Sequence, residues 1–286
     1  MGSLRDIRRR ITSVQKTQQI TRAMRMVAAA KLRRAQEAIQ AARPYAQHMR
    51  ATLEEVARSQ RDAEHPLLLR RDRVQRLEIV MVTSDRGLCG AFNANVIKHA
   101  EALAALRRGE TETISYTVVG RKGADYLRRR RRALSETHTG LGTIGYGHAA
   151  RIAQGLSERY AAGELDEVVL VYSEFVSTLT QRPRDVRLLP ITPSEVDEEG
   201  DSLPFEIEPS AAKLLAILVP KALEVEVYRA LLENQAGEHA ARMTAMESAT
   251  RNTEEMIGSL KLTYNRARQA AITKELMEIV SGAEAL

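Results

Sequence analysis

The chain has 286 residues, which is enough for one globular domain with additional long helices, and its 44% apolar content is that of a folded protein. Its single cysteine, Cys89, excludes an internal disulfide and a multi-cysteine zinc site. The net charge is +6, no apolar run approaches the roughly 18 residues of a membrane span, and no signal-peptide pattern opens the chain, so we expect a mature cytoplasmic protein.

Residues 1–58 are predicted to form one long helix that pairs with another helix. Steps of three and four residues from Leu4 reach mostly apolar or small side chains over about seven heptads, which is a coiled-coil pattern. Ser3 is a predicted N-cap, with Asp6 completing an aspartate version of the capping box, and Pro44 is expected to bend the helix. The expected core positions are Leu4, Ile7, Ile11, Val14, Gln18, Thr21, Arg25, Ala28, Leu32, Ala35, Ile39, Ala42, Ala46, Met49, Leu53 and Val56.

The same helix is strongly basic. Between Met1 and Arg50 about twelve Lys and Arg residues stand against Asp6 and Glu37, which leaves the rest of the chain mildly acidic. Three interpretations are open: a solvated helix face, a nucleic-acid-binding surface, or a helix enclosed by an acidic protein partner. Nucleic acid is the weakest, because no aromatic residues alternate with the charges and no DNA-binding motif is present.

Residues 73–192 are predicted to form a Rossmann-like open α/β domain, after a polar linker that contains Pro66. Short β-branched and apolar runs alternate here with amphipathic stretches, which indicates a largely parallel sheet with helices on its faces. The expected strands are residues 77–83, 113–119, 167–175 and 185–190, and the expected helices are residues 92–107, 122–132 and 147–162.

A sheet of this kind invites a search for a nucleotide site. Gly140, Gly142 and Gly145 have the dinucleotide-binding spacing, but the residues before them are arginine-rich and polar and are not expected to form a strand. No P-loop pattern is present. The glycine motif is therefore a weak candidate.

The segment 83–90 follows the first expected strand, where sheets of this type bind ligands. Cys89 lies near the start of the next helix, a position that lowers the pKa of a thiol. The favoured alternative is a tight turn in which Gly87 and Gly90 adopt unusual dihedral angles and Asp85 caps the following helix.

The remaining candidate residues carry weaker signals. The six histidines show no metal-ligand spacing, and the arginine run at 128–132 is interpreted as a solvated face. The sequence predicts no catalytic residue, no metal site and no cofactor.

Residues 211–286 are predicted to form the second long helix, after an acidic, proline-punctuated segment that contains Phe205. Beyond the expected core, Ile272, Leu276, Ile279 and Val280 form an apolar stripe on a different helix face, which predicts a second partner or reflects the drift of a straight helix against a strict heptad. The expected core positions are Leu232, Ala236, His239, Met243, Met246, Thr250, Thr253, Ile257, Leu260, Tyr264, Ala267 and Ala271.

The predicted fold class is thus α/β, with an antiparallel coiled coil of the two terminal helices. Two functions of other classes fit parts of it. A coiled-coil scaffold explains the long helices but not the polar Arg268 and Gln269 within the apolar surface of the helix end. A nucleotide-dependent enzyme explains the sheet but lacks a credible phosphate loop.

Four segments resemble the gamma subunit of bacterial F-type ATP synthase, and the resemblance spans the whole chain. They are residues 1–11 (MGSLRDIRRRI), 17–31 (TQQITRAMRMVAAAK), 84–90 (SDRGLCG) and 262–282 (LTYNRARQAAITKELMEIVSG). The arginine-rich segment 125–147 is the part least like the family.

The resemblance implies a non-catalytic rotor that couples proton flow to ATP synthesis. Its paired helices would stand inside a ring of alpha and beta subunits, and its α/β domain would contact the epsilon subunit and the membrane c-ring at the cytoplasmic face of the bacterial inner membrane. It also implies partner contacts, which are expected at Met24, Arg268, Gln269, Ile272, Leu276 and Ile279. A contact with the membrane ring and epsilon is expected at Phe205, because its acidic segment lies at the opposite end of the chain's layout from the helix ends.

Overall fold

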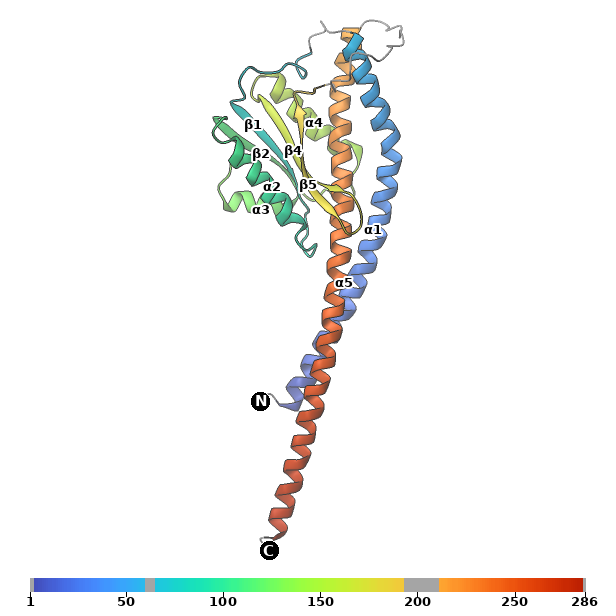
Figure 1. The fold of residues 1–286 in the computed structure, drawn as a ribbon, viewed down its shortest axis with the longest axis vertical. Helices are drawn as coiled ribbons and strands as arrows, with labels where there is room; N and C mark the ends of the chain where they lie inside the picture. Colours follow the sequence, from blue (N-terminus) through green and yellow to red (C-terminus); the bar gives the residue numbers. More distant parts are fainter. Residues whose placement is uncertain (1–2, 60–64, 193–210, 285–286) are drawn as a thin grey trace. The chain divides into compact units, whose positions relative to one another are not determined.

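The computed structural model describes residues 3–59, 65–192 and 211–284, and Figure 1 shows their order along the chain. The chain folds as two compact units, one of residues 1–29 with 242–286 and the other of residues 30–241. Phe205 and the acidic segment around it lie outside the described residues. None of the described helices combines the length and apolar content needed to cross a bilayer.

Helix α1 spans Leu4–Ser59 as one element. The predicted capping box fixes its start, because the backbone N–H of Asp6 donates to Ser3 Oγ at 3.3 Å and the backbone N–H of Ser3 donates to Asp6 Oδ2 at 3.2 Å. The helix continues through Pro44, whose carbonyl oxygen lies 2.7 Å from Nδ1 of His48.

Helix α5 spans Ala211–Glu284 and contains 74 residues, with Pro220 in its third turn. At the rise of an α-helix this is about 110 Å, far more than one compact domain covers. Helix α5 therefore belongs to both units: residues 211–241 pack in the second unit and residues 242–286 in the first.

The second unit is built on a five-stranded sheet of order β3-β2-β1-β4-β5. The first four strands are parallel and β5 pairs antiparallel with β4, which confirms the predicted open, largely parallel sheet. The strands are β1 (Arg76–Val82), β2 (Thr113–Val119), β3 (Leu134–His138), β4 (Glu167–Phe175) and β5 (Gln181–Leu189).

Strand β3 was not predicted from the sequence. It holds an edge of the sheet with the sequence LSETH, and none of its five side chains is fully buried. A short edge strand needs no continuous apolar run, so the arginines before it and its own polar residues hid the signal.

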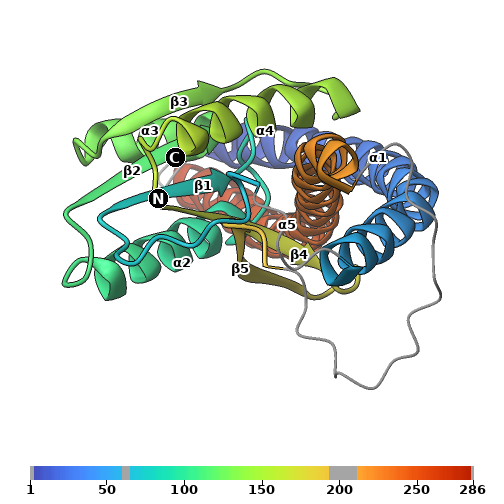
Figure 2. The ribbon, with the colours of Figure 1, turned by 90° about the horizontal axis from the view of Figure 1, so that it is seen from above.

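Two layers of helices cover the sheet. Helices α2 (Phe92–Arg107) and α3 (Arg121–Arg129) pack on Ile79 and Met81 of β1. Helix α4 (Tyr146–Ala161) and the first turns of α5 pack on Val80 and Val82, which point to the opposite face. Figure 2 shows α2 and α4 on opposite sides of β1. Successive side chains of a strand point to opposite faces of the sheet, so β1 contributes side chains to both hydrophobic cores.

Among the described strand residues, Glu78 is the most deeply buried charged side chain. Glu78 of β1 is fully buried and accepts hydrogen bonds from the hydroxyls of Thr117 at 2.6 Å and Ser135 at 3.0 Å, and from that of Ser115. The guanidinium of Arg159, at the end of α4, donates to the same carboxylate at 3.1 Å. The buried charge is therefore fully compensated, as burial of a carboxylate requires.

Candidate functional site

The first unit is an antiparallel pair formed by the start of α1 and the second half of α5. Polar contacts across the pair fix its register: Arg8 NH2 donates to the Tyr264 hydroxyl at 3.3 Å, Gln18 Nε2 donates to Glu254 Oε1 at 3.0 Å, and the Thr21 and Thr250 hydroxyls lie 2.8 Å apart. Partner numbers thus sum to about 272, so each step forward on α1 is a step back on α5.

The predicted core positions are confirmed with one exception. All twelve positions of α5 from Leu232 to Ala271 are buried or half-buried, and so are those of α1 apart from Arg25, which is exposed. Met24 is half-buried beside it. An α-helix with 3.6 residues per turn drifts against a strict heptad, and in this part of α1 the drift moves position 25 out of the core.

The end of α5 has no α1 partner. In the observed register Leu4, the first residue of α1, lies opposite about residue 268, so the following turns extend beyond α1. Ile272, Leu276 and Ile279 are 48%, 57% and 68% exposed. Steps of four, four and three residues place Arg268 on the same helix face as these three side chains.

Arg268 and Gln269 are both exposed, and neither forms a hydrogen bond or ion pair with another described residue. The structure therefore brings five of the predicted contact residues together on one helix end. Met24 is separate, because its register partner lies about 20 residues away from Arg268 on α5, or roughly 30 Å of helix. Phe205 lies outside the described residues.

The second unit was tested for a ligand site at the carboxyl edge of its sheet. In open α/β sheets the site lies where the strand order reverses, here between β1 and β4. Phe92, 4% exposed, fills this position against α5, since a Cβ atom on Gly237 would lie only 3.1 Å from its ring. Asn234 Oδ1 of α5 also accepts the Ser173 backbone N–H of β4 at 3.2 Å. Helix α5 therefore occupies the usual ligand crevice.

The N-terminus of α3, a second position where nucleotide phosphates bind in such folds, is also filled. Its backbone N–H groups at Arg121 and Gly123 donate to Asp85 Oδ1 at 3.0 Å and to Thr83 Oγ1 at 2.9 Å. Asp85 also accepts the Gly140 N–H at 2.9 Å. The prediction that Asp85 caps the next helix, α2, is wrong: the carboxylate reaches α3 and the loop after β3, which sequence proximity does not reveal.

The turn at residues 83–90 differs in detail from its prediction. Leu88 and Gly90 have positive φ values of 62° and 57°, whereas Gly87 does not. Cys89 is 2% exposed, and the Asn93 side-chain amide donates to its sulfur at 3.2 Å. A thiol enclosed in this way is a packing residue of the turn.

The sequence predicts no strand before the glycine motif at 140–145, and this prediction is wrong. Strand β3 does precede it and α4 begins at Tyr146 just after it. The motif nevertheless follows the outermost strand of the sheet, whereas a dinucleotide fingerprint follows a central one. Among the described residues, no group of three or more His, Cys, Asp or Glu side chains could hold a metal ion.

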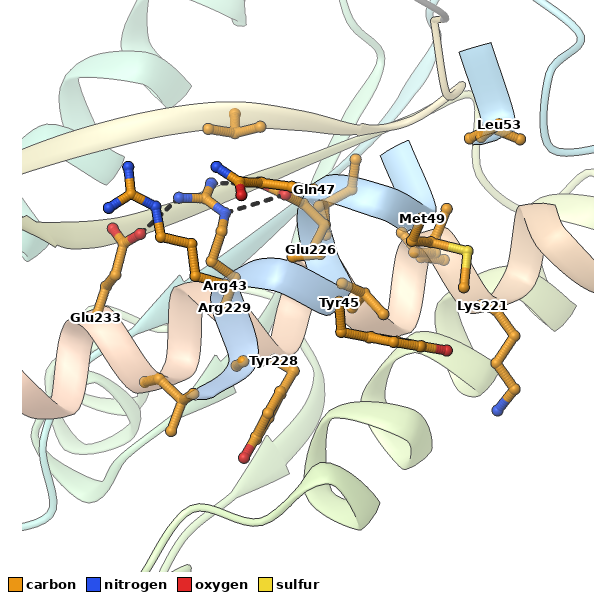
Figure 3. A pocket seen from close by; sticks show the side chains of 18 of the residues that line it. Arg43, Tyr45, Gln47, Met49, Leu53, Lys221, Glu226, Tyr228, Arg229 and Glu233 are labelled. Carbon is orange, nitrogen blue, oxygen red and sulfur yellow. Dashed lines mark hydrogen bonds and ion pairs between the residues drawn. The ribbon is translucent and has the colours of Figure 1, made fainter. Parts of the chain in front are cut away.

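A cavity of about 980 Å³ lies in the second unit among α1, α5 and β5 (Figure 3). Its charged floor is internally paired, because Arg229 donates to Glu226 at 2.5 Å and to Glu233 at 2.6 Å. Burial lowers the pKa of Arg229, but the two carboxylates outweigh it and the pKa is raised. Burial raises the pKa of Glu233 against the opposing charge of Arg229. These ion pairs link successive turns of α5.

Internally paired helices, a helix end with an unpartnered apolar stripe, and a sheet whose ligand positions are filled by its own chain define a class of protein. It is a paired-helix shaft protein with an α/β domain in the same chain.

Comparison with known proteins identifies the family. A family model described as ATP synthase matches residues 3–286. The ATP synthase gamma chain of Geobacter sp. (strain M21) is 50% identical over 286 residues, which cover 100% of this chain and 99% of the relative. That of Anaeromyxobacter sp. (strain Fw109-5) is 52% identical over 291 residues, covering 100% of both.

Solved structures agree. A chain of the Tetrahymena thermophila mitochondrial ATP synthase central stalk and c-ring is 27% identical, with a TM-score of 0.61 over 80% of this chain and 99% of that chain. A chain of the Euglena gracilis mitochondrial ATP synthase has the same fold, with 20% identity and a TM-score of 0.70 over 99% of this chain and 94% of that chain. The chain belongs to the ATP synthase gamma-chain family, and its function is that of the non-catalytic central-stalk rotor of an F-type ATP synthase.

Proposed function

We propose that this chain transmits torque between a c-ring in the membrane and a catalytic ring of alpha and beta subunits, and so couples proton flow to ATP synthesis. An epsilon subunit is the further partner, bound at the α/β domain. The complex would stand at the cytoplasmic face of the bacterial inner membrane. The observation that carries this proposal is the unpartnered end of α5, whose exposed apolar stripe needs an enclosing surface.

The mechanism requires only contact. Each rotary orientation of the shaft presents a different face to a given catalytic subunit, so the shaft acts as a ligand that binds one conformation of that subunit better than another. The nucleotide affinity of the ring then changes without any chemistry on the shaft. Regulation of ATP hydrolysis would use the same differential contact.

Arg268 and Gln269 are the proposed orientation-dependent contacts with a beta subunit. The exposed guanidinium of Arg268 can make a bidentate bond to a carboxylate, worth about 1.5–3 kcal/mol, and the amide of Gln269 can add about 1 kcal/mol. Met24 is proposed to face the same ring further along the paired helices. Ile272, Leu276 and Ile279 are proposed to turn within an apolar bearing.

The test replaces Arg268 with Ala and Gln269 with Leu in the assembled complex. Both substitutes are good helix formers, so the helix is expected to remain intact. The complex should assemble while steady-state synthesis and hydrolysis both fall several-fold.

A matched control carries Arg251→Ala with Asn252→Leu, the same chemical change at two exposed positions within the paired part of α5. This control should retain near-normal rates. Normal assembly with unchanged rates in the Arg268 and Gln269 variant would show that these two residues form only a solvated helix face.

A further inference from the structure

The amino edge of the sheet in the second unit collects arginines from several chain segments. Parallel strands begin at one edge, and the helices between them end there, so residues distant in sequence meet. Arg76 at the start of β1 pairs with Asp166 before β4 at 2.8 Å, and Arg107 at the end of α2 pairs with Glu167. Cations at helix C-termini are also favoured by the helix dipole.

Further arginines lie at this edge beside two tyrosines. Burial raises the pKa of Tyr116 to about 12, and Arg132 and Arg108, from the ends of α3 and α2, both lie close enough to oppose that rise. On the other side of the sheet the Arg71 guanidinium lies 5.6 Å from the centre of the Tyr160 ring, at the end of α4.

Most of the exposed arginines of this edge have no acidic partner. Six of them are exposed and form no ion pair with any described carboxylate, while Asp72 and Glu112 are acids of the same edge that form none either. The edge therefore carries a net positive charge. We call these six residues the basic edge: Arg71, Arg73, Arg108, Arg129, Arg130 and Arg131.

The backbone at the end of α3 is unusual for an arginine. Arg131 has φ of 53°, in the left-handed region that glycine favours after a helix end. A helix end that needed only to stop would be more stable with glycine at this position. The strained arginine adds a charge to the basic edge.

Exposed leucines accompany the arginines. Leu106, beside Arg108, is 76% exposed, and Leu69, beside Arg71, is 43% exposed. Apolar side chains that project among cations are typical of surfaces that rest in the headgroup region of a bilayer.

We propose that the basic edge docks on anionic lipid headgroups at the membrane surface. The proposal rests on the proposed function for the nearness of a membrane. Lipid fits better than nucleic acid, because the described residues of the basic edge include no aromatic side chain for base stacking, and the ring of neighbouring Tyr126 lies under the Arg130 guanidinium, which is 5.5 Å from its centre. Fluid lipid also fits a rotor, since mobile headgroups present no fixed angular partner and so do not hold the rotor at one angle.

The test uses the soluble catalytic complex that contains this chain, sedimented with phosphatidylcholine vesicles with and without phosphatidylglycerol. The variant carries Arg129→Gln and Arg130→Gln. The control carries Arg121→Gln and Lys122→Gln, which remove the same charge from the opposite end of the same helix, where both side chains are also exposed.

We expect binding to anionic vesicles only, weakened about tenfold by the Arg129 and Arg130 variant and little changed by the control. Raising the ionic strength from about 0.05 to about 0.5 M should abolish it. Leu106→Ser should weaken binding without reducing its salt dependence.

Equal loss in the variant and the control, or equal binding to neutral vesicles, would overturn the proposal. Tighter binding of the wild-type complex to DNA or to an acidic protein, with the same dependence on Arg129 and Arg130, would also overturn it. Assembly of the complex is measured separately, so loss of assembly would count against the proposed function and not against the basic edge.

Discussion

Replacing Glu78 with Ala is the sharpest test of how the α/β unit is held together. The substitution removes a carboxylate that is 0% exposed within the sheet and leaves three hydroxyl groups and the Arg159 guanidinium without their shared acceptor. The hydroxyls belong to three residues on two neighbouring strands, so the loss spans β1, β2 and β3.

The magnitude follows from what Arg159 can do afterwards. Breaking a buried ion pair costs about 3–5 kcal/mol when the remaining charge has no other partner. Arg159 is 27% exposed, so water can reach it in the variant, and Glu164 at 3.8 Å offers it a second carboxylate. The free-energy cost of losing its pairing with Glu78 is therefore at the low end of that range. The stranded hydroxyls add about 1 kcal/mol. The expected loss of unfolding free energy is about 4 kcal/mol.

Urea unfolding of the full-length chain, followed by circular dichroism, measures this loss. With an m-value of about 3 kcal/mol/M, the midpoint should fall by about 1.3 M at unchanged m. Glu164→Ala is the control: it removes a 64% exposed carboxylate from the same arginine and should cost under about 1 kcal/mol.

A Glu78→Ala midpoint within experimental error of the Glu164→Ala midpoint would refute the reasoning. It would mean that the carboxylate at Glu78 is not the acceptor that joins the three strands to α4.

Three further predictions concern other parts of the chain. Burial raises the pKa of Asp166, but the hydrogen bonds from Arg76 and Gln75 outweigh burial and hold the pKa below its ordinary value. The ionised carboxylate therefore stabilises the fold above the unfolded pKa of about 3.9, and this stabilisation is lost as the pH falls further. In thermal unfolding, the difference in stability between wild type and Asp166→Asn should be full at pH 7 and should vanish at low pH. Thr21→Val should destabilise the helix pair by about 1 kcal/mol, because the buried Thr250 hydroxyl loses one of its two hydrogen-bond partners and keeps the Met246 carbonyl oxygen; the double Val variant, which removes both hydroxyls, should be no less stable than Thr21→Val in the same unfolding assay. Phe205→Asp, in the acidic segment proposed to contact the c-ring and epsilon, should weaken the coupling of proton flow to synthesis while soluble hydrolysis persists; equal loss of both activities would contradict this role.

The helical part of the fold could be predicted because its signal is local and repeated. A pattern that repeats over about seven heptads is still recognisable with one misplaced position, Arg25, because every other predicted core position of α1 is buried or half-buried. The apolar stripe from Ile272 to Ile279 could also be predicted, because its residues recur at helical spacing. Strands β1, β2 and β4 were likewise marked by runs of β-branched residues, whereas β5 has the sequence QRPRDVRLL with one valine and was predicted only over residues 185–190.

What could not be predicted depends on contacts between distant residues. The role of Asp85 is set by Arg121 and Gly140, which lie 36 and 55 residues away. The basic edge forms only when Arg108, after α2, and Arg132, after α3, come together near Tyr116 of β2. In the sequence alone, residues 128–132 therefore look like an ordinary solvated run. The filling of the ligand crevice by Phe92, which packs against Gly237 of α5, has no local pattern either.

The antiparallel pairing of the two chain ends has a consequence for how the protein is made. Arg8 meets Tyr264 across 256 residues of sequence, so the first helix leaves the ribosome long before its partner exists. At about 5–20 residues per second, translation leaves it waiting for roughly 13–50 s. Isolated helices are marginal in water, and this one exposes Leu4, Ile7 and Ile11 until α5 arrives. The nascent N-terminus is therefore a natural client for a chaperone, and removal of α5 from Leu260 onward should leave it in that state permanently.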